Sequence, residues 1–270
     1  MLGIKVFEFA PFVEERLKAA PHILAELDAD ILLLQEVFGK VQRLQLAAVL
    51  ADLYPYSACS ERTPPFGLGD GLLLLSRYPV ERQCVFSFRR CFLEERVIGG
   101  IGFQSASVLI PEFGALDVFN VHLTAGGAMH TPHFRRAERL RANQIAELVQ
   151  VAATSRPCHL LGGDFNAGPE ISPANYQQLI AAGYMDCFSE NSERPNFTWD
   201  VRNPLNANGP HRHCPSQRMD HVFLSSSAKD KLAVTRAEIM LDKPRVQLAT
   251  GETCTVSDHY AVRVTFRFDL

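Results

Sequence analysis

The sequence predicts a mixed α/β (α+β) fold in a single domain that spans residues 1–270. Continuous apolar runs, such as 31–34 and 158–161, suit strands that are buried on both faces. Amphipathic stretches at helical spacing, such as 14–27, separate these runs. No internal repeat, low-complexity tract or linker divides the chain, and α/β and two-sheet folds of this length often form one unit.

The individual elements follow from the same patterns. Alternating apolar and polar residues on both sides of a turn at 113–115 predict an antiparallel meander. The long polar segment at 191–216 predicts a functional loop, and residues 54–69, rich in Pro and Gly, predict another loop. We expect helices at 14–27, 41–53, 134–151 and 175–182, and strands at 4–9, 31–34, 72–75, 85–88, 97–110, 116–121, 158–161, 222–224 and 260–268.

Composition limits the classes of function. The net charge is −3 and the isoelectric point about 6.3, so the chain lacks the basic field that non-specific nucleic-acid binding needs. No apolar run reaches the roughly 18 residues of a membrane span, and no signal-peptide pattern begins the chain. The seven cysteines are scattered, which indicates neither a disulfide framework nor a zinc site. We expect a reduced, monomeric, cytoplasmic protein that is able to contact a membrane peripherally.

The stretch at 160–169 presents a carboxylate and an amide just beyond a buried strand. Gly162 and Gly163 are expected to let the backbone turn sharply before Asp164 and Asn166. A carboxylate there can hold a metal or take a proton, and an amide can donate to an oxyanion without competing for the metal. A plain strand-ending Asx turn explains Gly-Asp-x-Asn about equally well when that motif is taken alone.

Similar residues lie at the ends of other predicted strands. If the strands share a sandwich, these ends converge at one edge. Four carboxylates there would repel one another unless a hard cation lay among them, and oxygen ligands favour Mg²⁺ or Mn²⁺. Two histidines beside such a cation suit a phosphate ester, because one can position water and the other can hold phosphoryl oxygens. The set is Glu36, His122, Asp164, Asn166, Asp220, Asp258 and His259.

Five short motifs follow one another at these strand ends: Gln35-Glu36, Asn120-Val121-His122-Leu123, Gly163-Asp164-Phe165-Asn166, Arg218-Met219-Asp220-His221 and Ser257-Asp258-His259. Their order resembles that of the endonuclease/exonuclease/phosphatase superfamily, from about residue 15 to the C-terminus. The resemblance implies a four-layer α/β sandwich, with two mixed β-sheets packed face to face and flanked by helices. It also implies Mg²⁺-dependent hydrolysis of a phosphodiester or phosphomonoester by in-line attack of water.

The resemblance assigns the acids and the amide. Glu36 resembles the metal ligand of the family, and Asp258 would lie close to that metal. Asp164 resembles the acid that orients or deprotonates the attacking water, and Asn166 the amide that holds the phosphate.

The resemblance also assigns the histidines. His259 resembles the histidine that contacts the scissile phosphate or acts as base, and Asp220 the carboxylate that fixes its tautomer. His122 resembles a second phosphate-binding histidine, with Asp70 as a candidate acidic partner. Without the other motifs, His122 would more often be a satisfied core histidine.

The N-terminus departs from the family pattern. The family begins with a strand that carries an asparagine beside the metal, whereas no Asn precedes Asn120 here. Either residues 4–9 are that strand, pairing with 31–34 and bringing Glu8 towards Glu36, or the chain lacks the first strand. The second interpretation weakens the metal site and keeps a non-catalytic binding module as an alternative.

For the substrate, a phospholipid or sphingolipid phosphodiester is favoured over DNA or RNA. Nucleases need Lys and Arg along a groove, whereas the basic cluster at 135–141 is expected to be a solvated helix face. The small-residue loop at 124–128 and the segments at 168–170 and 198–200 resemble neutral sphingomyelinases in particular. An endonuclease or exonuclease of the same fold is the alternative.

Several neighbouring features have two interpretations. The apolar residues at 125–129 and Phe134 could rest against a bilayer or simply pack. Trp199 is equally suited to anchor the long loop and to form a pocket wall. The cluster of His211, His213 and Cys214 is expected to be a solvated segment in preference to a zinc site.

Overall fold

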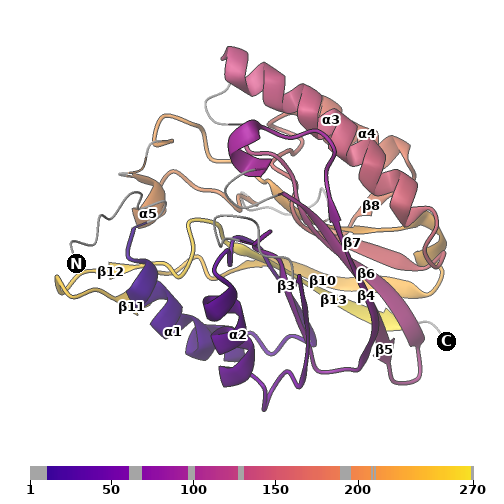
Figure 1. The fold of residues 1–270 in the computed structure, drawn as a ribbon, viewed down its shortest axis with the longest axis horizontal. Helices are drawn as coiled ribbons and strands as arrows, with labels where there is room; N and C mark the ends of the chain where they lie inside the picture. The colour runs from indigo at the N-terminus through magenta and orange to yellow at the C-terminus, as the bar shows by residue number, and fades with distance from the viewer. Residues whose placement is uncertain are drawn as a thin grey trace.

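The computed structural model describes residues 11–60, 69–96, 101–126, 131–188, 196–207, 209 and 211–268. It confirms the predicted α/β class. Figure 1 shows helices α3 (Pro132–Ala152) and α4 (Pro173–Ala181) on one side, α1 (Val13–Ala25) and α2 (Lys40–Val49) on the other, and strands between them. The expected strand at 4–9, and Glu8 with it, lies outside the described residues.

The first strand layer is one mixed sheet. In spatial order it contains β4 (Val80–Ser87), β5 (Gly102–Ile110), β6 (Gly114–His122), β7 (His159–Asp164), β9 (Asp220–Leu224) and β8 (Met185–Asp186). Strands β4, β5 and β6 form the predicted antiparallel meander. Strands β6 and β7 are parallel and joined through α3, whereas β9 runs antiparallel to β7. Strands β6 and β7 therefore end at the same edge of the sheet at which β9 begins.

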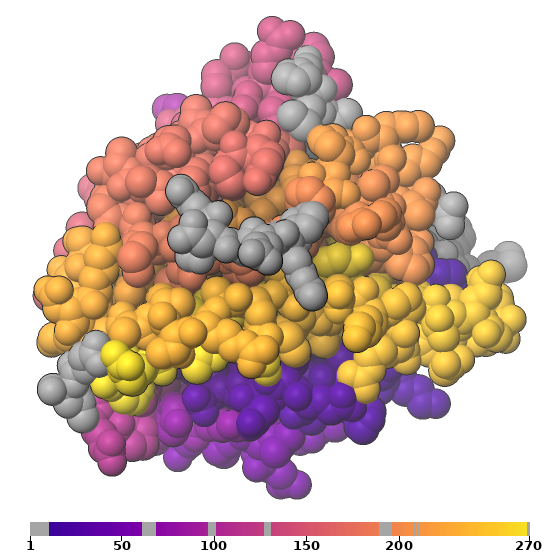
Figure 2. All heavy atoms as spheres, turned by 180° about the vertical axis from the view of Figure 1, so that it is seen from behind, coloured from indigo at the N-terminus to yellow at the C-terminus, as the bar shows by residue number. Residues whose placement is uncertain are grey.

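The second strand layer consists, within the described residues, of two antiparallel sheets and a short hairpin. The sheets are β1 (Ile31–Leu34), β3 (Leu73–Ser76) and β2 (Tyr56–Cys59), and β10 (Leu232–Met240) with β13 (Ala261–Phe268); the hairpin is β11 (Val246–Gln247) and β12 (Thr253–Cys254). Figure 2 shows the C-terminal residues, in yellow, as a band between the orange segment and the indigo N-terminal residues.

Two parts of this layer differ from the prediction. The expected loop at 54–69 is wrong for residues 56–59, because β2 pairs with β3. Strand β10 is also unpredicted, and its register shifts between Val234 and Arg236, which interrupts the alternation that would have marked it.

Buried apolar side chains hold the layers together in three clusters. Helices α3 and α4 cover the outer face of the mixed sheet with side chains such as Ile145 and Leu179. The two strand layers meet through residues such as Val118 and Leu74. Helices α1 and α2 cover the opposite face of β1 and β3, where Leu73 is buried. Successive leucines of β3 thus face different clusters, as the continuous apolar run predicts.

One buried polar side chain joins the two strand layers. The Nδ2 of Asn120, on β6, donates to the carbonyl oxygens of Leu34 at 3.0 Å and Leu73 at 3.3 Å. Its Oδ1 accepts a hydrogen bond from Nε2 of Gln35 at 2.6 Å. All three partners belong to β1, to β3 or to the residue that follows β1. The residue after Gln35 is Glu36, so this contact also fixes where the second layer presents that carboxylate.

Replacing Asn120 with Leu, which has nearly the same shape, should lower the free energy of unfolding by about 3 kcal/mol or more. Two carbonyls and the Gln35 amide would lose their partner, at about 1–3 kcal/mol for each buried group. Urea denaturation measures the change. The control is Ser107→Ala, which removes the hydrogen bond donated to Asp117 and the one accepted from Arg156 and should cost about 2 kcal/mol. Equal effects of the two variants would contradict the role of Asn120.

Candidate functional site

The edge at which β6 and β7 end gathers several of the predicted site residues. Asp164 pairs with His122 in the parallel register and with Asp220 in the antiparallel register. One ligand atom from each of Asp164, Asp220 and His259 lies within 4.8 Å of the other two. Residues that are far apart in the sequence thus meet around one carboxylate.

The two glycines before Asp164 have a different role from the predicted one. Gly162 and Gly163 lie within β7 and do not make a sharp turn. A Cβ on Gly163, where φ is 136°, would lie 2.1 Å from the Val121 carbonyl oxygen, and one on Gly162 would lie 2.6 Å from the Leu33 side chain. The glycines therefore allow β6 and the second strand layer to approach β7 closely.

His259 reaches the site from the second strand layer, just before β13. Its Nδ1 lies 2.8 Å from Oδ2 of Asp220. Thr198 links the two, because its Oγ1 accepts from the Asp220 N–H at 3.1 Å and its carbonyl from the Tyr260 N–H at 2.6 Å. Trp199 forms a β-bridge with His259, and it is only 5% exposed. The tryptophan therefore packs as an anchor of the long loop.

Charge interactions shift the pKa values in this group. Desolvation alone would lower the pKa of His259, but the charge and hydrogen bond of Asp220, followed by the charge of Asp164, raise it well above its usual value. Burial, and then the negative charge of Asp220, raise the pKa of Asp164 to about 6. At neutral pH His259 therefore favours its protonated form, while Asp164 can exchange a proton close to neutral pH.

His122 lies between two carboxylates. Its Nε2 is 3.7 Å from Oε1 of Glu36 and 3.8 Å from Oδ2 of Asp164, and burial lowers its pKa. Its buried Nδ1 has no hydrogen-bond partner in the described part of the chain. The prediction that Asp70 is its acidic partner is wrong, because Nδ1 has no partner among the described residues and the acids beside Nε2 are Glu36 and Asp164. Asp70 instead accepts a hydrogen bond from the Leu72 N–H at 3.0 Å.

Glu36 follows β1 in a left-handed backbone conformation, with φ at 60°. The next residues are held by Arg43, whose Nη1 donates to the carbonyls of Val37 at 2.8 Å and Phe38 at 3.0 Å. Desolvation, and then the negative charge of Asp258, raise the pKa of Glu36. Since 61% of the side chain is exposed, solvent moderates both effects. A strained backbone at an exposed carboxylate points to function more than to stability.

Asp258 is half-exposed, at 43%, and lies 3.9 Å from Nη2 of Arg16. Its backbone carbonyl accepts from the side-chain amides of Asn203 at 3.2 Å and Asn206 at 2.9 Å. These three neighbours are not among the predicted site residues. The Asn203-Pro204 pair is a helix-start signal that could have located α5 (Pro204–Ala207) and its asparagines, whereas no local signal distinguishes Arg16.

Asn166 holds the carboxylate of Asp164. Its backbone N–H donates to Oδ1 at 2.8 Å, and its Nδ2 donates to Oδ2 at 3.0 Å and to the Leu123 carbonyl at 2.9 Å. The backbone again takes a left-handed conformation, with φ at 48°. A phosphate oxygen would have to displace one of these acceptors before the side chain could donate to it.

The structure corrects one prediction about the helix that follows His122 and decides between the two interpretations of Phe134. Arg141 does not lie on a solvated face, because its buried guanidinium donates to the Thr124 carbonyl at 2.9 Å and to Ser172 Oγ at 2.7 Å. Burial lowers its pKa to about 10. Phe134 packs under this guanidinium, 5.4 Å from the ring centroid, and is 4% exposed, so it is not available to a bilayer.

The donor set fits a hard divalent cation. Asp220 raises the pKa of Asp164, and Asp258 raises that of Glu36, which shows that the acids repel one another. A cation among carboxylate oxygens would remove this repulsion. Of the segment that was expected to be solvated, His211 and His213 are exposed, whereas Cys214 is buried in an apolar cluster with Trp199 and Met219.

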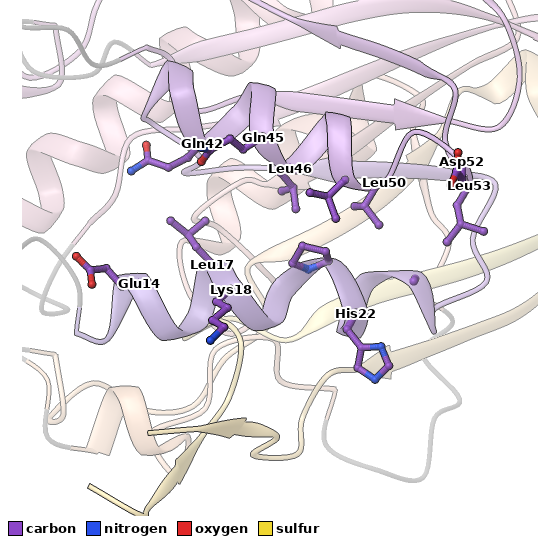
Figure 3. A pocket seen from close by; sticks show the side chains of 13 residues that line it. Glu14, Leu17, Lys18, His22, Gln42, Gln45, Leu46, Leu50, Asp52 and Leu53 are labelled. Carbon is purple, nitrogen blue, oxygen red and sulfur yellow. The ribbon is translucent and has the colours of Figure 1, made fainter. Parts of the chain in front are cut away.

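A groove of about 880 Å³ lies elsewhere, between α1 and α2, and Figure 3 shows side chains such as Leu17, Leu46 and Leu50 along it. None of the predicted site residues lines it. The groove and the carboxylate site are therefore separate. In the described part of the chain, no helix combines the length and the apolar character needed to cross a membrane.

Solved structures share this fold. The crystal structure of SmcL matches with a TM-score of 0.72 and 16% identity, over 93% of this chain and 90% of that chain. A mutant of beta toxin from Staphylococcus aureus, with bound magnesium ions, matches with a TM-score of 0.69 and 16% identity, over 94% and 92%.

Relatives in sequence include two proteins that are named as phosphodiester-cleaving enzymes. The inositol phosphosphingolipids phospholipase C of Schizosaccharomyces pombe is 22% identical, over 95% of this chain and 64% of the relative. The 5'-tyrosyl-DNA phosphodiesterase of Caenorhabditis elegans is 24% identical, over 93% and 62%. The chain thus spans less than two thirds of the length of either relative. The model of the Endonuclease/Exonuclease/phosphatase family matches residues 12–259, and the chain therefore belongs to that family.

Proposed function

We propose that the chain hydrolyses a phosphodiester in a Mg²⁺-dependent reaction, by in-line attack of water on phosphorus. The observation that carries this proposal is the hydrogen-bonded pair of His259 and Asp220 directly beside the buried Asp164. His259, as a cationic donor, and Asp164, as a proton acceptor, are thereby close enough to reach the same phosphoryl group, as such a reaction requires.

Glu36 would hold the cation, with Asp258 beside it, and Mn²⁺ would substitute for Mg²⁺. When bound, the cation neutralises charge and polarises a phosphoryl oxygen. Glu36 and Asp258 are the most exposed acids of the site, which leaves their oxygens accessible. Asp220 is committed to His259 and is a weaker candidate ligand.

Asp164 orients the attacking water and accepts its proton. Its pKa of about 6 lies close to neutral pH, where a general base is effective. Asn166 contributes by fixing both oxygens of that carboxylate with its backbone and side-chain N–H groups.

The two histidines stabilise the phosphoryl oxygens. His259, kept protonated by Asp220, donates from Nε2 as negative charge grows in the transition state, because Nδ1 is held by the aspartate. His122 presents its own Nε2 to the same space and contacts a second oxygen.

We further propose a lipid headgroup phosphodiester, of the phospholipid or sphingolipid class, as the substrate, reached by peripheral contact with a membrane. The relative named for inositol phosphosphingolipids supports this class. The net charge of −3 supports it too, since there is no excess of cations for a nucleic-acid backbone. The likeness to a 5'-tyrosyl-DNA phosphodiesterase favours a DNA phosphodiester as the second candidate.

A panel of substrates separates these candidates. Vesicles of sphingomyelin and of inositol phosphosphingolipid are compared with abasic DNA, single-stranded DNA and a 5'-tyrosyl oligonucleotide, each in Mg²⁺ and in EDTA. We expect release of the phosphorylated headgroup from vesicles in Mg²⁺ only. Efficient DNA cleavage without lipid turnover would place the chain among nucleases, and no hydrolysis of any substrate would favour a binding module.

Glu36→Gln should lower kcat by on the order of a hundredfold or more, because several kcal/mol of charge stabilisation depend on the cation. The fold should remain intact, since the side chain is largely exposed. Rates over a titration of Mg²⁺ check this. Glu26→Gln is the matched control, because Glu26 is an exposed acid bound to Arg245 at 2.7 Å. Undiminished wild-type activity in EDTA would refute the role of Glu36.

His259→Ala and Asp220→Ala should each lower kcat by on the order of 10² to 10⁴, the range of general acid–base groups. The double variant should be little worse than the worse single one, because the two side chains act as a unit. His159→Gln, at the other end of β7, breaks a hydrogen bond to Tyr184 and should affect stability only. Losses that multiply in the double variant would show that the two residues act separately.

A further inference from the structure

Two buried polar side chains of the mixed sheet lack hydrogen-bond partners in the described part of the chain. They are His122 on β6, at its Nδ1, and Gln104 on β5, at both its amide nitrogen and its amide oxygen. The Gln104 side chain is completely buried. A buried amide without any partner is rare, because it has lost its hydration without replacement.

The strand register makes these two side chains diagonal neighbours. Gln104 pairs with Asn120, and Gly102 pairs with His122, across β5 and β6. Gln104 and His122 therefore lie on the same face, towards the second strand layer. Diagonal neighbours in an antiparallel pair are about 7–8 Å apart, within reach of a long side chain. Gly102, directly opposite His122, carries no side chain, and the backbone of Phe86 lies where its Cβ would be.

The surroundings of His122 determine which kind of hydrogen-bond partner its Nδ1 requires. Nε2 faces carboxylate oxygens of Glu36 and Asp164, which favours a proton on Nε2. The other nitrogen of the ring is then an acceptor, and it requires a donor. Asn120 cannot provide one, because its Nδ2 already donates to the Leu34 and Leu73 carbonyls. The amide of Gln104 carries two N–H donors that are not engaged.

We propose that Gln104 is a positioning residue for His122. Its amide donates to Nδ1, after rotation of the side chain or through one buried water, and keeps the ring proton on Nε2. A water between them would meet the polar partners that a buried water needs, in the two amide atoms and Nδ1. The inference rests on the proposed function for what the Nε2–H group then does, which is to contact a phosphoryl oxygen.

Gln104→Met tests this, because methionine keeps the unbranched shape and removes both hydrogen-bonding atoms. Imidazole ¹⁵N resonances of His122, identified by their loss in His122→Gln, report which nitrogen carries the proton. We expect Nε2–H in the wild type and a mixture of tautomers in Gln104→Met. The thermal midpoint should fall, since the buried Nδ1 of His122 loses its donor. On the substrate found in the panel, kcat should fall about tenfold with little change in KM.

Ser107→Ala is the control on the same strand. Ser107, further along β5 and away from His122, donates to Asp117, so its loss should lower the midpoint and leave the His122 resonances and kcat unchanged. Unchanged His122 resonances in Gln104→Met, or a lower midpoint with unchanged kcat, would overturn the proposal. The ¹⁵N spectrum needs no substrate, so it tests the tautomer even if every substrate in the panel resists hydrolysis.

Discussion

The amide of Asn120 sets the position of one strand layer against the other. Apolar contacts in the core between the layers are strong in sum but non-directional, so they tolerate sliding. The hydrogen bonds that Asn120 donates to Leu34 and Leu73 and accepts from Gln35 are directional, and leaving any of these buried partners unbonded is costly. The amide therefore selects one relative position. In that position Glu36 of the second layer faces the carboxylate and histidine of the first.

Two acids of the site differ from Asp186 in the direction of their pKa shifts. Burial alone would raise the pKa of Asp186 on β8, but hydrogen bonding and charge from His221, together with the charge of Arg218, lower it to about 2. At Asp164 and Glu36 the balance is the opposite, and both pKa values are raised. Cationic partners thus outweigh burial at Asp186, whereas burial is the largest cause of the raised pKa values of Asp164 and Glu36. Perturbed acids of this kind are typical of functional sites.

Sequence patterns were sufficient to predict the features that residues close together in the sequence determine. Apolar runs with polar residues at their ends located the central strands and the candidate residues, and the family resemblance supplied the layer order. Partners and burial depend on segments that are distant in the sequence, which is why Asp70 and Arg141 were assigned wrongly. Arg141 is buried because Thr124 and Ser172, from two separate loops, provide its acceptors. The glycines before Asp164 were misjudged for the same reason, since only the neighbouring strands reveal a close approach. The roles of the site residues, the single domain and the monomeric state stay predictions.

The hydrogen bond between His259 and Asp220 joins the two strand layers, because Asp220 begins a strand of the mixed sheet and His259 precedes β13. Its length of 2.8 Å therefore depends on how one layer is positioned on the other. A displacement of one layer by an ångström or two would separate the pair while every strand kept its own backbone pairing. Chemistry in this chain is consequently more fragile than secondary structure. On heating, circular dichroism would still record a folded protein at temperatures where the histidine had already lost its aspartate.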